Sequence, residues 1–269
     1  DGTLSRFTGA SAVAIYRGGH YPEEFIGDAF VPEPTGNLFR RDDVTEADGK
    51  ITAINPYARD KGEFLTSTDE IFRPVNAYMG PDGAMYLVDM YHGIIQHRIF
   101  LTSYLRKQAE SRGLEKVVDY GRIYRIVHKT RALDRGPNLA QADTRQLVAT
   151  LSHQNGWYRD NAQRILVEKA PPASIALLKQ LATGGRNHLG RVHVLWTLSG
   201  LGYVDLELLQ AVLKKEQHPK VIATGLRLCE PILKTWEQDD ALKLVTAQVD
   251  SGNHDVRVQV AHAAHAVCV

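Results

Sequence analysis

The sequence predicts a β + α multidomain protein, with the C-terminal blades of a β-propeller up to about Val127 and an α-α HEAT-like solenoid after it. Three observations predict this fold class. Short alternating runs separated by turn residues fill the first part of the chain. Apolar residues at helical spacing follow from Asp143 onward. The helical pattern also recurs every thirty-odd residues, near the lower end of the periods found for stacked helix pairs.

The first part of the chain contains short strands that end at turn residues. We expect strands at Ala12–Tyr16, Asp28–Pro32, Asn37–Arg40 and Ile51–Ile54. The dipeptide Asp48-Gly49, just before the last of these, favours positive φ and therefore a tight reversal of the chain.

The clearest hairpin surrounds the turn Gly80-Pro81-Asp82-Gly83. Pro81 fixes φ, the Asp82 side chain can accept from nearby backbone N–H groups, and Gly83 takes the position that needs positive φ. A further alternating strand is expected at Gly121–Val127. Short strands joined by such turns favour a meander of blade type over βαβ units.

Changes of pattern divide the chain into three parts. Residues 1–130 are expected to form a partial propeller of closing blades with a helical insertion near 102–113, and residues 131–142 a linker. Residues 143–269 are expected to form about four HEAT-like repeats, each with a leucine-rich helix, a loop and a second helix that opens with a basic residue. No repeat can bury its apolar face alone, so the repeats must stack. The chain opens without Met and stops inside an apolar helical pattern, so we expect a truncated, internal piece of a longer protein.

The composition narrows the function classes. With 43% hydrophobic and 23% charged residues, the chain has the composition of a globular protein. A formal net charge of +1 gives no basis for nucleic-acid binding, and no apolar run approaches the roughly 20 residues of a transmembrane segment. Cys229 and Cys268 lie far apart and predict neither a disulfide framework nor a paired-cysteine metal site.

One candidate site comes just before the strand that leads into the Gly80 turn. Asp69, Glu70 and Arg73 cluster there. The planar fork of Arg73 could hold an anionic cofactor such as a carboxylated quinone. It could equally pair with Asp69 to fix the loop, and both alternatives stay open at this point.

Two further groups of candidates follow. Tyr91 and His97, with His92 between them, come after the next strand, and a histidine with a shifted pKa could serve as a base. Asp82 and Asp89 could ligate a cation. A turn-capping role for Asp82 and a strand-end role for Asp89 are simpler explanations, so we assign no metal site.

Several stretches carry a family resemblance. Ile15–Gly18, Phe25–Val31, Phe72–Tyr86 and Gly121–Ile126 resemble late blades and the closing strand of the quinoprotein glucose/sorbosone dehydrogenase propellers. A second set is similar to a large bacterial group, common in planctomycetes, in which such a propeller is followed by HEAT repeats and often by a c-type cytochrome module. That set comprises Glu63–Val75, Asp89–Arg98 and Asn155–Asp160. Members of the group are known as membrane-bound dehydrogenase-like or haem-binding proteins.

The resemblance implies an extracytoplasmic parent protein, periplasmic or membrane-associated, that uses pyrroloquinoline quinone (PQQ) and calcium to oxidise a sugar or polyol. The candidate cofactor-binding residues are Arg73, Asp69, His97 and Tyr91, and the resemblance strengthens the case for Arg73. Electrons would pass to haem c, but the attachment string Cys-x-x-Cys-His is absent, so a haem module would lie beyond Val269. In the dehydrogenase relatives the catalytic base and many cofactor contacts come from earlier blades. We therefore do not expect this fragment to be active alone.

Two functions fit these observations. The first is a fragment of a quinone-dependent dehydrogenase that carries a HEAT protein-interaction module. The second is a non-catalytic binding or scaffold protein, in which propeller loops and the concave HEAT surface take a protein or polysaccharide partner.

Overall fold

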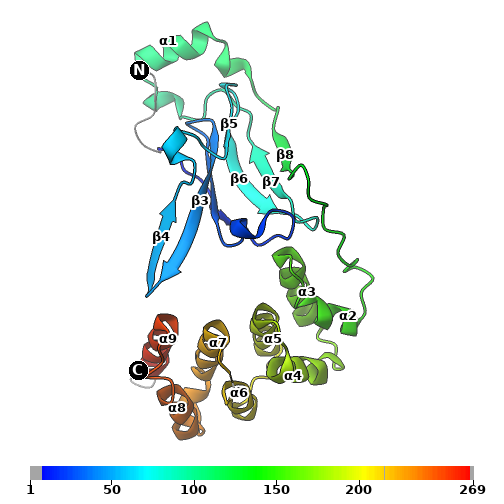
Figure 1. The fold of residues 1–269 in the computed structure, drawn as a ribbon. Helices are drawn as coiled ribbons and strands as arrows, with labels where there is room; N and C mark the ends of the chain where they lie inside the picture. The colour runs from blue at the N-terminus through cyan, green and yellow to red at the C-terminus, as the bar shows by residue number, and fades with distance from the viewer. Residues whose placement is uncertain (1–7, 215, 267–269) are drawn as a thin grey trace. The chain divides into compact units, whose positions relative to one another are not determined.

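The computed structural model describes residues 8–214 and 216–266. The chain divides into two compact units. Unit one contains the residues up to Arg135 apart from the turn Ala47–Lys50, and unit two contains that turn and the residues from Gly136 onward. Antiparallel sheets make up most of unit one, and helices make up unit two (Figure 1).

The first sheet of unit one has the strand order β1-β2-β3-β4, with β5 paired to β3. Its strands are β1 (Ala14–Ile15), β2 (Ala29–Glu33), β3 (Leu38–Ala47), β4 (Lys50–Ile54) and β5 (Leu65–Thr66). Single-turn 3-10 helices follow β1 and β4, namely η1 (Glu23–Phe25) and η2 (Ala58–Asp60). Asp48 and Gly49, between β3 and β4, both have positive φ, as the sequence predicted.

The second sheet is the antiparallel set β6-β7-β8. Its strands are β6 (Pro74–Met79), β7 (Met85–Asp89) and β8 (Arg122–Ile126). The predicted turn between β6 and β7 is confirmed. The Gly80 N–H donates to the Ala84 carbonyl at 2.9 Å, Asp82 Oδ1 accepts from the Ala84 N–H at 3.1 Å, and Gly83 has a φ of 77°.

A short helical segment separates β7 from β8. It consists of η3 (Arg98–Phe100), α1 (Ser103–Ser111) and η4 (Leu114–Lys116). The Thr102 hydroxyl caps α1 by accepting from the Leu105 N–H at 3.2 Å.

Aromatic and aliphatic side chains from both sheets form the core of unit one. The fully or nearly fully buried members are Tyr16, Tyr21, Phe30, Phe39, Phe72, Ala77, Met85 and Leu87. The Tyr16 hydroxyl lies at the centre: it donates to the Gly83 carbonyl at 2.8 Å and accepts from the N–H groups of His20 and Tyr21. One side chain thus joins the start of the chain to the β6–β7 turn.

The blade arrangement predicted from the sequence is not what these two sheets form. Propeller blades are four-stranded sheets arranged radially. Within the described residues one sheet has five strands, the other has three, and the pair is not propeller-like. The difference arises because β3 runs for 10 residues, far beyond the predicted Asn37–Arg40, and pairs with β2, β4 and β5.

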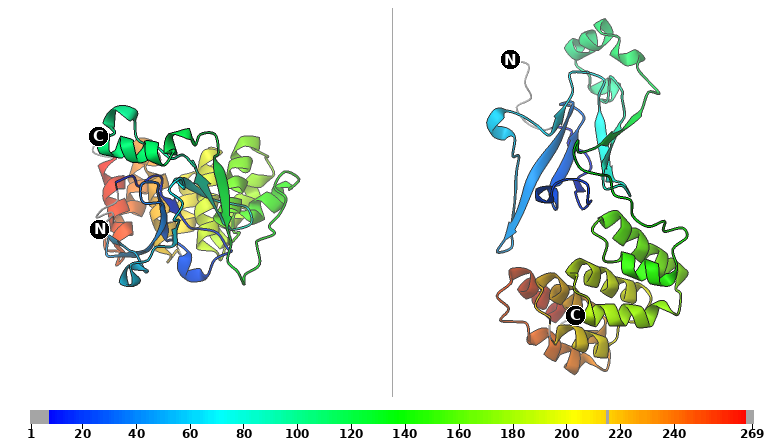
Figure 2. Two further views of the ribbon diagram at one scale, coloured as in Figure 1. Left: turned by 90° about the horizontal axis from the view of Figure 1, so that it is seen from above. Right: turned by 45° about the vertical axis from the view of Figure 1, so that its right-hand side comes forward.

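Unit two consists of consecutive helices joined by short loops. Their bounds are α2 (Thr144–Thr150), α3 (Gly156–Lys169), α4 (Ser174–Gly184), α5 (His188–Gly200), α6 (Leu206–Leu213), α7 (Pro219–Cys229), η5 (Ile232–Lys234), α8 (Gln238–Thr246) and α9 (His254–His265). The helices lie in two rows (Figures 1 and 2). One row is formed by α3, α5, α7 and α9 and the other by α2, α4, α6 and α8, with contacts between successive members of each row.

Similar caps begin the helices of the first row. Asn155, Asn187 and Asn253 cap α3, α5 and α9 by accepting a backbone N–H through the side-chain oxygen. His218 caps α7 in the same way through Nδ1. These caps explain why the helices restart at similar spacings along the chain.

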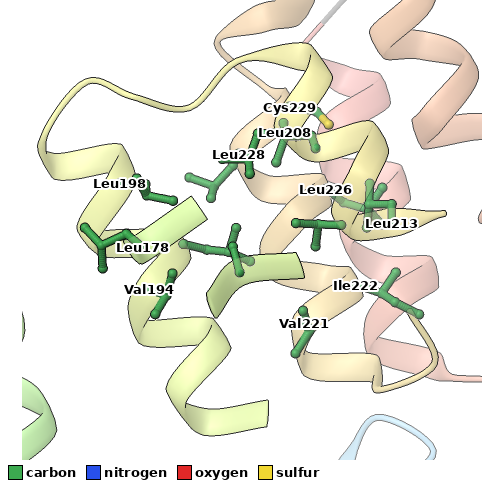
Figure 3. Close-up of a cluster of buried hydrophobic side chains, with 14 of the residues drawn as sticks. Leu178, Val194, Leu198, Leu208, Leu213, Val221, Ile222, Leu226, Leu228 and Cys229 are labelled. Carbon is green, nitrogen blue, oxygen red and sulfur yellow. The ribbon is translucent and has the colours of Figure 1, made fainter. Parts of the chain in front are cut away.

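The core of unit two is one continuous set of buried aliphatic residues. Leucine, valine and isoleucine side chains from successive helices pack together (Figure 3). Cys229 is buried within this core, and burial raises the pKa of its thiol to about 12. Cys268 lies outside the described residues. Within the described ranges, no helix is both long enough and apolar enough to cross a bilayer.

Candidate functional site

The candidate site lies where β6 begins and β7 ends. Arg73 immediately precedes β6, and Asp89 is the last residue of β7. The pairing of Pro74 with Asp89 brings these two positions together, and a β-bulge follows between Pro74 and Asn76. Bulges next to sites commonly re-aim a side chain, and here the bulge lies beside Arg73.

The guanidinium of Arg73 is bound to the backbone of two loops. Its Nη1 donates to the Pro34 carbonyl at 2.7 Å, and its Nε and Nη2 donate to the carbonyls of His92 and Gly93 at 3.3 and 3.1 Å. Burial lowers the pKa of Arg73, while nearby Glu70, Glu33 and Asp89 favour its charged form. Arg73 therefore fixes the loop after β2 to the loop after β7.

Asp89 holds the same region from the opposite side. Its carboxylate is 1% exposed, and Oδ1 accepts from the N–H groups of Arg73 and Tyr91 at 2.7 and 2.8 Å. Within the described residues, Oδ2 of Asp89 is buried without a hydrogen-bond partner. The strand-end role expected for Asp89 is therefore present, in the form of a buried cap on the following loop.

Glu33 completes the group of charged residues, although little in the sequence marked it. The side chain is fully buried. Its Oε1 accepts from the N–H groups of Thr8 and Gly9 at 3.1 and 2.7 Å, and its Oε2 accepts from the N–H of Gly36. A lone acidic residue between Pro32 and Pro34 was the only available signal.

Asp69 caps a turn. Its Oδ1 accepts from the Ile71 N–H at 3.0 Å, and its own N–H donates to Ser67 Oγ at 3.1 Å. Within the described part of the chain, Asp69 and Arg73 form no ion pair, so the loop is not fixed by the pairing considered from the sequence. Glu70 instead pairs with Arg112 at 2.7 Å on the surface.

Tyr91 lies on the loop that Arg73 holds. Its φ is 47°, in the left-handed region that a tyrosine seldom adopts. The Arg122 guanidinium lies 3.4 Å from the centre of its ring, which is a cation–π geometry. Backbone strain of this kind is tolerated where the surroundings determine the conformation, and here Asp89 and Arg73 supply the bonds that do so.

The two histidines are placed differently. Nδ1 of His92 lies 2.5 Å from the Ile94 carbonyl, which orients the ring within the loop. His97 is exposed and contacts Phe100 with a ring separation of 6.2 Å. The structure thus brings Arg73 and the Tyr91 loop together, whereas Asp69 and His97 contact other groups.

Asp82 has the turn-capping role that was the simpler expectation. Besides capping Ala84, it accepts from the Tyr86 hydroxyl at 2.9 Å and pairs with Arg125 at 2.8 Å. Across the described residues there is no group of three or more His, Cys, Asp or Glu side chains placed to hold a metal ion.

A small cavity lies beside the Tyr91 loop. Its volume is about 210 Å³, and its lining includes Ile94, Leu101, Ala109 and Glu115. None of the four predicted cofactor residues lines it. The arrangement at the ends of β6 and β7 is therefore suited to holding loops in place, because its polar groups are directed to backbone rather than into a cavity.

Comparison with known proteins adds one similarity. Residues 1–130 match the sequence profile of a domain of unknown function, DUF7133. No curated protein matches the chain, and no solved structure does.

Proposed function

We propose that the chain is a binding module whose helical unit takes a protein partner, as part of a larger extracytoplasmic protein. Unit two would then be a HEAT-like solenoid. The support is the same neighbour relation repeated along the chain, since α3 contacts α5, α5 contacts α7 and α7 contacts α9. Stacked helix pairs of this kind offer an extended surface for partners.

A groove on unit two is the observation that carries the proposal. Its volume is about 390 Å³, and it is lined by Trp196, Arg227, Pro231 and Lys234 together with neighbouring residues of α5 and α7 and Ala266 just after α9. Trp196 is 40% exposed there. Tryptophan and arginine are the residues most often found at the energetic centre of protein interfaces.

An exposed tryptophan follows the groove in the chain. Trp236 comes two residues after Lys234 and is 92% exposed. A tryptophan ring offers a large apolar area and an N–H donor, and both are available to a partner here. The polysaccharide alternative uses the same aromatic groups, so the experiment has to distinguish the two.

The test compares the full chain with two variants. The full chain, Trp196→Ala and the control Tyr78→Ala, whose ring is exposed on unit one, are immobilised and exposed to the native extract. We expect a protein retained by the full chain and by Tyr78→Ala but lost with Trp196→Ala. Retention of the same proteins by all three would contradict the proposal, and retention of polysaccharide alone would favour the alternative.

The second candidate is quinone-dependent oxidation by the longer parent protein, and the sequence resemblance supports it. The Tyr91 loop is the part of this chain that such a function would use, since Arg73 and Asp89 hold it in a strained conformation. A carboxylated quinone is best held by cationic donors that face it, and Arg73 uses three of its five N–H groups on backbone carbonyls. Arg73 therefore acts mainly on the loops, and a quinone would need further cationic contacts.

This second function requires contacts from other parts of the parent protein. Its test is dye reduction with sugars and polyols by the full-length parent supplied with PQQ and calcium. Turnover that needs both additions would support the dehydrogenase. If the parent neither bound PQQ nor turned over any substrate, the dehydrogenase function would be ruled out and the partner-binding function would be retained.

A further inference from the structure

The strand β8 is an edge strand: within the described residues it pairs with β7 on one side and with no strand on the other. Figure 1 shows β8 on the outside of β6 and β7. The Gly80 N–H donates to the Ala84 carbonyl and the Met90 N–H to the Arg73 carbonyl, so the backbone groups of Ala84 and Met90 face β6. Backbone groups of successive residues in a strand point to opposite sides. Those of Met85 and Leu87 therefore point toward β8.

The register between β7 and β8 then identifies the groups on the outer edge. Met85 pairs with Ile126 and Leu87 with Tyr124, so the backbone of Ile126 and Tyr124 faces β7. The N–H and C=O groups of Ile123 and Arg125 face away from the sheet. Within the described residues no backbone hydrogen bond reaches these outward groups.

Two apolar side chains are exposed along this edge, which is unusual for an edge strand that contacts only solvent. Ile123 is 70% exposed, and the next alternate apolar residue, Val127, is 49% exposed. A strand with exposed apolar side chains and unpaired backbone groups is a template for another strand.

The charges along the edge select the partner. Residues 121–131 contain Arg122, Arg125, Lys129 and Arg131 and no acidic residue. Arg125 is paired with Asp82, and Arg122 stacks on Tyr91 and donates to the Tyr124 hydroxyl at 3.2 Å. Lys129 and Arg131 are exposed, and no ion pair within the described residues neutralises them. Two copies of β8 would bring like charges together, which opposes pairing of the chain with itself.

The segment after β8 is held in a fixed position. The His128 N–H donates to His20 Nε2 at 2.8 Å, and His20 Nδ1 lies 3.0 Å from the Ala132 carbonyl. His20 is buried. The basic residues Lys129 and Arg131 are therefore presented from an anchored backbone, so ordering them on binding costs little additional entropy.

From these observations we infer that β8 is a docking edge for an extended acidic peptide, which adds as a further strand beside β8. Backbone hydrogen bonds to Ile123 and Arg125 supply affinity. The apolar contact with Ile123 and Val127 sets the register, and the cations Lys129 and Arg131 select acidic side chains. This site lies in unit one and does not depend on the groove of unit two.

The test uses a synthetic probe. A fluorescein-labelled, end-capped octapeptide of alternating glutamate and valine is titrated with the full chain, and a lysine–valine octapeptide of the same pattern serves as its control. We expect the glutamate peptide to bind at least 10-fold more tightly, with an affinity that falls as salt rises from about 50 to 300 mM. Amide exchange should slow at Ile123 and Arg125 when it binds.

Two kinds of variant separate the backbone from the charge. Ile123→Pro removes one outward N–H and no bond to β7, so it should weaken binding at least 10-fold, while Ile123→Thr keeps the N–H and should weaken it no more than about 3-fold. Should Ile123→Pro fail to fold, Lys129→Glu combined with Arg131→Glu should remove the preference for glutamate. Equal binding of both peptides, undiminished binding by Ile123→Pro, or dimerisation through β8 in sedimentation would overturn the inference.

Discussion

The two units hold their chains together by different means. In unit one, buried polar groups join loops that are distant in sequence: the Tyr16 hydroxyl reaches Gly83, and Arg73 reaches Pro34. In unit two, a continuous aliphatic core joins successive helices, and most caps reach only two or three residues along the chain. Loss of one buried group should therefore disturb several loops of unit one, whereas losses in unit two should stay among neighbouring helices.

The positions of the tryptophans make the comparison measurable. Trp157, Trp196 and Trp236 all lie in unit two, so tryptophan fluorescence reports on that unit. Most tyrosines lie in unit one, so the tyrosine signal in near-ultraviolet circular dichroism reports mainly on the sheets. Urea unfolding followed by both signals separates effects on the two units.

Arg73→Met should have the largest effect. It leaves the carbonyls of Pro34, His92 and Gly93 without their donor, so the free energy of unfolding of unit one should fall by about 3 kcal/mol. The tyrosine signal should show this, and tryptophan fluorescence should not change. Arg112→Met is the control, because its pair with Glu70 is half exposed and should be worth less than about 1 kcal/mol. An unchanged tyrosine transition for Arg73→Met would mean that Arg73 does not stabilise the loops.

Tyr16→Phe comes next in size. It removes the acceptor for the N–H groups of His20 and Tyr21 and the donor to Gly83, so we expect a loss of about 2 kcal/mol in unit one. The matched control is Tyr78→Phe, whose hydroxyl accepts from Asn76 Nδ2 at the exposed surface and should matter by no more than about 0.5 kcal/mol. Equal transitions for the two variants would count against a joining role for the Tyr16 hydroxyl.

Asn187→Ala tests the caps of unit two. The side chain of Asn187 accepts from the Gly190 N–H at 3.1 Å at the start of α5, so its loss should cost about 1 kcal/mol. Tryptophan fluorescence during urea unfolding measures it. Gln210→Ala, at an exposed position in α6, should change the transition by less than about 0.5 kcal/mol. If the tyrosine transition shifted as much as the tryptophan transition, the effect would not be confined to unit two.

The smallest effect depends on pH. Burial, the stacked ring of His218 at 3.8 Å, and the charges of Lys220 and Arg159 lower the pKa of His188. Because the unfolded chain then binds a proton more readily than the folded chain, the stability that neutral His188 contributes is present above its ordinary pKa of about 6.5 and lost as pH falls below it.

The measurement is the tryptophan unfolding transition between about pH 7.5 and 5.5. We expect unit two to lose stability over this range and His188→Gln to reduce the loss. His262→Gln, at an exposed position of α9, should leave the slope unchanged. Identical slopes for the chain and His188→Gln would show that protonation of His188 does not oppose folding.

Local chemistry made much of the fold predictable. The Gly80–Gly83 turn, the positive φ values at Asp48 and Gly49, and the strand at Gly121–Val127 follow from short-range sequence preferences, and the structure has all three. The helices after Asp143 follow from apolar periodicity. The length of β3 was not predictable, because the mainly polar residues after Arg41 show no clear apolar alternation, and beyond Asp42 the pairing with β4 extends the strand.

The sequence indicated where the candidate site lies but not which groups its residues bind. The sequence drew attention to Arg73 and Tyr91, which lie together, but the acceptors of Arg73 are backbone carbonyls. Every residue has a carbonyl, so no residue type in the sequence marks these partners. Glu33 and His20 were missed for the same reason, since each is recognised by the backbone groups of distant segments.

Native-state hydrogen exchange on Arg73→Met is the sharpest test of Arg73 as a tie between loops. We expect faster exchange at residues 34–36 and 89–93, where Arg73 and Asp89 hold the loops, with exchange in α5 and α7 unchanged. Unaltered exchange in those loops, or an equal increase across both units, would contradict the claim that Arg73 is a buried tie between loops of unit one.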